Sequence, residues 1–311
     1  MTFTKTCLLG GVVGLALVVN GCRSTDTDAP TPGVPTETAN RTIEDGGTGA
    51  YKALMASDGT LPTHTVFRPT DLSQFGRREK LPIIVWGNGA CANSPWEHVN
   101  FLSEVASHGY LVIAIGPMPA VGQRGGAGGP TKSALLTDAI NWAIAQNSDK
   151  TSQYYRKLDA TKIAAAGMSC GGLQTLEVAP DVRITTAMIC NSGILGDPGR
   201  GMGGMPKLAK EQLEKLRTPV IYILGGEKDI AYNNGMDDFR RINHVPVFAA
   251  NLNVGHGGTY SRPHGGDFAK VATAWFQWQL KGDKQAAKMF EGEPCGVAQM
   301  SGWKVEKKNI R

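Results

Sequence analysis

One stretch, KIAAAGMSCGGLQTLEV at residues 162–178, holds the pattern G-x-S-x-G between a short apolar run and a helix-like segment. The run 162–166 predicts a buried strand, and residues 173–178 predict a helix. A serine on such a sharp strand-to-helix turn has its hydroxyl lifted out of the backbone, and only glycine fits two positions before and after it. The stretch therefore predicts Ser169 as a nucleophile.

The alternation of strand and helix patterns from about Thr48 onward predicts an α/β fold, with a mostly parallel central sheet flanked by helices on both faces. Thr131 and Asp267 are expected to cap two helices, and the C-terminal tail is expected to wrap around the domain with Phe290 and Trp303 as anchors. The expected strands are 63–68 (at an antiparallel edge), 82–86, 110–115, 162–166, 183–190, 219–224 and 245–253, and the expected helices are 95–106, 131–146, 173–178, 207–217 and 267–280.

The N-terminus has the pattern of a processed leader. Lys5 precedes an apolar segment, Leu8 to Val19, which has the length of a signal-peptide core and is too short to span a bilayer as a mature helix. It ends at Cys22 in a sequence that resembles a bacterial lipobox, apart from Asn20. We therefore expect a signal peptide over 1–21, a disordered tether rich in Pro, Thr and Asp over 22–47, and one α/β domain over 48–311. The protein is then exported, either as a cell-envelope lipoprotein or as a secreted protein.

Composition and charge are those of an ordinary globular protein. The 311 residues are 41% hydrophobic and 19% charged, which suffices for one large core. The formal net charge of +5 comes without any block of Lys or Arg, so no nucleic-acid partner is expected. Membrane contact is expected only through a lipid anchor on Cys22, and the basic residues of the tail, from Lys304 onward, are expected to be solvated.

Four cysteines follow the leader, at Cys91, Cys170, Cys190 and Cys295. An exported chain meets an oxidising compartment, where pairing is permitted, and four cysteines allow three connectivities. Cys91 and Cys170 both fall in loops that we expect to border the nucleophile, which favours that pair. Buried free thiols are the alternative.

A serine nucleophile needs an imidazole base, and the imidazole needs a carboxylate that orients it. Asp229 stands in LGGEKD, a tight turn directly after the expected strand 219–224. His256 stands in NVGHGG, directly after the expected strand 245–253. Because the carboxyl ends of parallel strands meet at one edge of a sheet, Ser169, Asp229 and His256 form the expected catalytic triad.

Other acids and histidines compete for these roles. Glu227, Asp237 and Asp238 are the rival acids, but Glu227 lies too near the strand end and the Asp pair resembles the first turn of a helix. His264 is the rival base, and a metal site on His256, His264 and Asp267 lacks any of the usual ligand spacings, so no metal is expected. We interpret the remaining histidines as surface or packing residues: His64, His98, His108 and His244.

The oxyanion formed during acyl transfer needs two backbone N–H donors. One is expected from Cys170, the residue after the nucleophile. The other is expected from the turn Gly87-Asn88-Gly89-Ala90, with Asn88 as the first choice and Gly89 as the next.

Taken together, residues 81–280 resemble the secreted α/β-hydrolases of the dienelactone hydrolase, cutinase and polyethylene terephthalate hydrolase group. The shared landmarks are the oxyanion turn at Asn88, the segment ASHGY at 106–110, the elbow at Ser169, EKD at 227–229, and Gly255-His256. The resemblance implies the α/β-hydrolase fold and a serine carboxylic-ester hydrolase that works through an acyl-enzyme without a cofactor.

The chain also departs from the polyester hydrolases of that group. Those enzymes carry aromatic residues where Asn88 and Asn191 stand here, and often Trp or His at the position of Met168. Their C-terminal disulfide cannot form, because no cysteine follows Cys295. We therefore expect Gly89, Met168 and Asn191 to contact a small or polar ester, such as an acylated sugar. The alternatives are a serine hydrolase of polyesters, lactones or peptides, and a non-catalytic surface lipoprotein that binds a ligand.

Overall fold

The computed structural model describes residues 39–122, 129–197, 201 and 203–310. The predicted signal peptide, Cys22 and most of the predicted tether lie outside these residues. In the described part of the chain, no helix is both long enough and apolar enough to cross a membrane.

Within that part, one ten-stranded sheet has the order β1-β2-β3-β5-β4-β6-β7-β8-β9-β10. Its centre, from β5 to β9, is parallel, and antiparallel strands complete both edges. The predicted α/β-hydrolase fold is confirmed. The strands are β1 (Asn40–Arg41), β2 (Ala53–Ala56), β3 (His64–Pro69), β4 (Leu81–Gly87), β5 (Leu111–Ile115), β6 (Leu158–Met168), β7 (Ile184–Cys190), β8 (Val220–Leu224), β9 (Val247–Leu252) and β10 (Trp303–Lys308).

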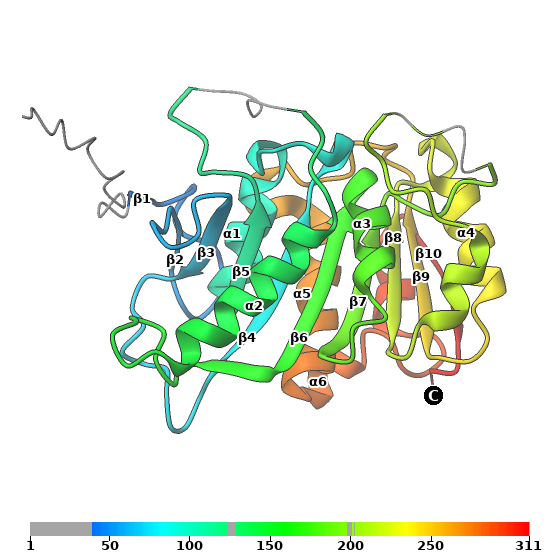
Figure 1. The fold of residues 1–311 in the computed structure, drawn as a ribbon. Helices are drawn as coiled ribbons and strands as arrows, with labels where there is room; N and C mark the ends of the chain where they lie inside the picture. The colour runs from blue at the N-terminus through cyan, green and yellow to red at the C-terminus, as the bar shows by residue number, and fades with distance from the viewer. Residues whose placement is uncertain (1–38, 123–128, 198–200, 202, 311) are drawn as a thin grey trace, which may run out of the picture. The chain divides into compact units, whose positions relative to one another are not determined.

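Helices cover both faces of the sheet (Figure 1). Helices α1 and α5 pack on one face, and α2, α3 and α4 pack on the other. The α-helices are α1 (Val99–Ser107), α2 (Ala134–Ser148), α3 (Cys170–Val178), α4 (Tyr232–Arg241), α5 (Gly266–Lys281), α6 (Lys284–Ala287) and α7 (Gly296–Gln299). Short 3-10 turns lie at η1 (Gly89–Cys91), η2 (Trp96–His98), η3 (Lys210–Lys215), η4 (Gly226–Lys228) and η5 (Pro263–Gly265).

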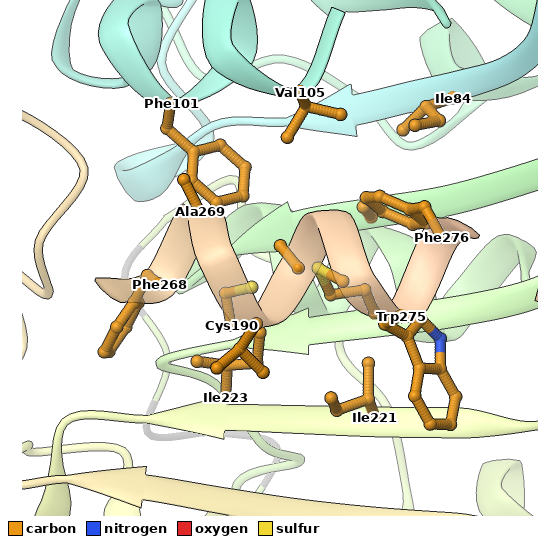
Figure 2. Packing of buried hydrophobic residues seen from close by; sticks show 14 of the residues in the cluster. Ile84, Phe101, Val105, Cys190, Ile221, Ile223, Phe268, Ala269, Trp275 and Phe276 are labelled. Carbon is orange, nitrogen blue, oxygen red and sulfur yellow. The ribbon is translucent and has the colours of Figure 1, made fainter. Parts of the chain in front are cut away.

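Helix α5 carries most of its large buried side chains on one face, and smaller buried residues such as Ala269, Thr273 and Ala274 extend its contacts to other sides. Its buried residues Phe268, Val271, Ala272, Trp275 and Phe276 recur at the spacing i, i+3, i+4, i+7 and i+8, which places them on one side of a helix. Each large apolar side chain buried in this way stabilises the fold by about 1.5–3 kcal/mol. Figure 2 shows the helix over the sheet residues Ile84, Cys190, Ile221 and Ile223.

The structure corrects two expectations about the ends of the domain. Residues 40–41, which we assigned to the tether, form β1 and pair with β2. The strand at 245–253 is not the last one, because the tail pairs with it as β10, although Phe290 and Trp303 are buried as expected. The sequence does not predict the strand in the tail, because only two of its six residues, Trp303 and Val305, are apolar.

Three helix predictions also need correction. The segment 207–217 forms only the 3-10 turn η3. Thr131 does not cap α2, because its hydroxyl donates to the Cys91 carbonyl instead. Asp267 lies inside the first turn of α5, where it pairs with Lys270, and α6 and α7 follow that helix.

Candidate active site

Ser169 lies on the turn between β6 and α3, in a backbone conformation that residues other than glycine rarely adopt. Its φ is +54° and its ψ is −116°. The turn is this tight because a Cβ on Gly167 would lie 2.3 Å from the Gly171 carbonyl oxygen, and a Cβ on Gly171 would lie 2.0 Å from the Gly87 oxygen. The two glycines therefore let the start of α3 press against the end of β4.

Substitution of Gly171 by Ala is expected to lower the free energy of unfolding by about 3 kcal/mol or more, because the new methyl group would collide with backbone that cannot rotate away. Thermal or denaturant unfolding would measure the loss. Gly196→Ala is the matched control, since no atom lies within 4 Å of a Cβ there. Equal stability of the two variants would contradict the steric argument.

The loops after β6, β8 and β9 bring the three predicted triad residues into one hydrogen-bonded chain. His256 Nε2 lies 3.0 Å from Ser169 Oγ, and His256 Nδ1 lies 2.6 Å from Asp229 Oδ1. The side chain of His256 is 28% exposed, whereas that of Asp229 is 0% exposed. A substrate can thus reach the serine and the imidazole, while water cannot compete for the carboxylate.

The carboxylate of Asp229 is held ionised by its neighbours. Burial alone would raise its pKa, but hydrogen bonds from His256, from the Ala231 and Gly225 amides and from Asn191 outweigh burial and hold the pKa of Asp229 below its ordinary value. An ionised carboxylate accepts, so His256 Nδ1 carries the proton and Nε2 is left free to accept the Ser169 proton.

Asn191 has a role beyond the predicted one. It lines the cavity beside Ser169, in keeping with the expected substrate contact, and its side-chain amide also donates to Asp229 Oδ2 over 2.7 Å. Its oxygen accepts a hydrogen bond from the hydroxyl of Tyr260. Tyr260 itself packs among Trp86 and Phe101 and was not singled out by the sequence, which gives no local sign of this partner. Asn191 and Tyr260 therefore position the Asp229 carboxylate through Oδ2, the oxygen that does not contact His256.

The segments that carry the two predicted oxyanion donors pack against each other. Cys170 is the first residue of α3, and a Cβ on Gly171 would come within 2.7 Å of the Asn88 backbone nitrogen. In the described part of the chain, neither the Asn88 nor the Cys170 backbone N–H has an acceptor. The side-chain amide of Asn88 fixes the turn by donating to the Ala92 and Ile115 carbonyls.

A disulfide between Cys91 and Cys170 joins these two segments, so the favoured pairing is confirmed. Cys190 and Cys295 are buried free thiols. Met168 and Gly89 also lie together, since a Cβ on Gly89 would meet the Met168 sulfur at 2.8 Å. The cross-link therefore spans from the residue after the nucleophile to the turn that carries the second donor.

The rival residues lie elsewhere. Glu227 is exposed, and Asp237 and Asp238 both pair with Lys210 from the second half of α4 rather than from its first turn. His264 faces a surface group of acidic side chains, with Glu44 at 3.5 Å. No group of His, Cys, Asp and Glu side chains among the described residues is arranged to hold a metal ion.

A small cavity of about 100 Å³ opens beside the nucleophile. Ser169 and His256 form one end of it, and Leu173, Leu195 and Ile230 contribute apolar walls. Two larger cavities follow the start of α1, and Met168 lines one of them.

Residues 47–193 match the family described as PET hydrolase-like. The matched segment contains the oxyanion turn and the elbow, whereas Asp229 and His256 lie beyond it. A search of the curated proteins gave no match. The family match agrees with the resemblance to the cutinase and polyethylene terephthalate hydrolase group, and it supports a hydrolase of esters in general.

Proposed function

We propose that this PET hydrolase-like α/β-hydrolase is a serine carboxylic-ester hydrolase that acts through an acyl-enzyme on small or polar esters. The observation that carries the proposal is the hydrogen-bonded chain Ser169–His256–Asp229 beside two backbone N–H groups without acceptors. An unused pair of amide donors next to a serine–imidazole contact is the arrangement that acyl transfer requires.

In the first half-reaction, Ser169 Oγ attacks the ester carbonyl carbon while His256 Nε2 takes the hydroxyl proton. The Asn88 and Cys170 N–H groups donate to the oxygen that becomes negative, and Asp229 stabilises the imidazolium. His256 then gives its proton to the departing alkoxide, which leaves as the alcohol. Water repeats the sequence on the acyl-enzyme, releasing the carboxylic acid and restoring Ser169.

The size of the small cavity supports a short acyl group. About 100 Å³ beside Ser169 accommodates an acetyl group or one slightly larger, and its walls are largely apolar. Long acyl chains, aromatic polyesters, lactones and peptides are the competing substrates. The leader-like segment before Cys22 is the basis for proposing that the enzyme acts outside the cytoplasm.

A covalent fluorophosphonate probe and an ester panel test this proposal. We expect the probe to label the wild type and not Ser169→Ala, and we expect p-nitrophenyl acetate to be hydrolysed at least about tenfold faster than p-nitrophenyl palmitate. An unlabelled wild type would favour a ligand-binding protein without activity. Labelling together with a preference for palmitate would instead overturn the substrate class.

A further inference from the structure

A groove runs along the start of α1, next to Met168 and the oxyanion turn. It consists of two cavities of about 450 and 630 Å³ that share Trp96, Glu97, His98 and Ser261. The first cavity reaches Met168 and Gly257, which adjoin Ser169 and His256 in the sequence. The second reaches the oxyanion turn. The small acyl cavity shares no lining residue with this groove, so the two spaces are separate.

Two buried polar atoms of the groove residues lack partners in the described part of the chain. They are Asn88 Oδ1 and His98 Nδ1, on side chains whose residues are only 1% and 2% exposed. The Asn88 amide nitrogen is already engaged by two carbonyl groups, so only its acceptor oxygen remains. A buried acceptor without a partner costs free energy that a donor from a ligand would recover.

His98 is an uncharged member of the groove wall. Its ring packs against Trp86 and Tyr260, with centroids 5.2 and 5.0 Å away. Burial lowers the pKa of His98 to about 3, so the imidazole is neutral and one of its ring nitrogens accepts. Glu97, which is exposed, adds a carboxylate that only accepts. Asn88 Oδ1 and the Glu97 carboxylate accept, whereas the neutral His98 ring offers one donor and one acceptor, so hydroxyl groups, which both donate and accept, suit the groove.

Trp96 adds an aromatic surface. The residue is half-buried, and among the described residues its ring takes part in none of the aromatic contacts that bury Trp86 and Trp275. An indole face beside acceptor groups suits a ligand that has an apolar C–H face and several hydroxyl groups. A sugar ring combines both properties.

We propose that this groove binds the alcohol portion of the ester and that this portion is a sugar unit, whose hydroxyl groups donate to Asn88 and Glu97 and hydrogen-bond with His98 while its ring packs on Trp96. The inference rests on the proposed esterase function. It predicts selection against esters whose alcohol portion brings only acceptors, as in aromatic polyesters.

The test compares two acetates of similar size, methyl O-acetyl-glucopyranoside and cyclohexyl acetate, because only the first has hydroxyl donors. We expect wild-type kcat/KM to be at least about tenfold higher on the sugar acetate, which is the factor that about 1.4 kcal/mol of binding provides. Trp96→Ala and Glu97→Gln should each lower that value several-fold, mainly through KM. Glu211→Gln, at an exposed glutamate on η3 outside the groove, is the control and should hydrolyse both acetates like the wild type.

Equal rates on the two acetates, or an equal loss on all substrates in the variants, would overturn the sugar subsite while leaving the esterase intact. If the wild type cleaved no acetate, the proposed function would fail instead. Saturation-transfer NMR with methyl glucoside would then test the groove alone. A transfer signal that the wild type gives and Trp96→Ala does not give would support the sugar subsite, and the lack of any signal with the wild type would refute it.

Discussion

Ser169→Ala and His256→Ala are each expected to lower kcat by about 10⁴- to 10⁶-fold, and the double variant is expected to lose little more than either single one. The reason is that the serine is a poor nucleophile without the imidazole, and the imidazole has nothing to activate without the serine. The 3.0 Å contact between them makes the two side chains one functional unit. Steady-state kinetics on p-nitrophenyl acetate, with active-site titration of the wild type, would measure all three losses.

The matched control is His264→Ala. That histidine lies on the surface facing Glu44, and its loss should leave kcat within about twofold of the wild type. Multiplicative losses in the double variant, or a large effect at His264, would show that another base serves Ser169.

Asp229→Asn is expected to lower kcat by about 10⁴-fold with little change in KM. In the wild type, one carboxylate oxygen accepts from His256 and Ala231 while the other accepts from Asn191 and Gly225. An amide has only one acceptor oxygen. If its NH₂ group faces His256, the proton moves to the wrong ring nitrogen and Nε2 can no longer accept from the serine. Glu227→Gln, on the exposed rival acid in the same turn, should keep normal activity.

The same substitution predicts a pH signature in stability. The folded-state pKa of Asp229 lies below its unfolded value of about 3.9, so its ionised form stabilises the fold above about pH 4. That contribution is lost as the pH falls through the folded-state pKa. The difference in unfolding free energy between wild type and Asp229→Asn should therefore be constant above about pH 4 and shrink below it. Denaturant titrations at a series of pH values would measure this difference. A difference that stayed constant below about pH 4 would contradict the hydrogen-bond assignment.

The sequence was most informative where function depends on the ends of strands. Asp229 and His256 each follow an apolar run directly, and parallel strands deliver their carboxyl ends to one edge of the sheet. The G-x-S-x-G pattern predicts the nucleophile turn because its two glycines are required by close backbone contacts of the turn, whatever the rest of the sequence. Local patterns thus sufficed to locate the central strands along the sequence and to identify the three side chains that follow them, whereas the spatial order of the strands comes from the structure.

Residues whose position depends on distant packing could not be foreseen. Tyr260 donates to Asn191 across 69 positions in the sequence, and no periodicity marks either residue as part of that pair. Asn191 is predicted as a substrate contact because it stands where related enzymes carry an aromatic residue, but nothing in the sequence shows that its amide also donates to Asp229. His98 was interpreted as a surface or packing residue. The rings of Trp86 and Tyr260 do pack against it, but its place along a groove emerges only from the folded chain.

Whether the disulfide between Cys91 and Cys170 is formed depends on the redox state of the compartment. Glutathione and thioredoxin keep cytosolic thiols reduced, so a newly made chain would carry two separate sulfhydryl groups until it met an oxidant. If the chain is exported as proposed, it exists first as a dithiol and then as the disulfide form, and the link between the segments that carry the two amide donors is acquired only after export. A preparation kept in a strong reductant would be assayed as the immature species.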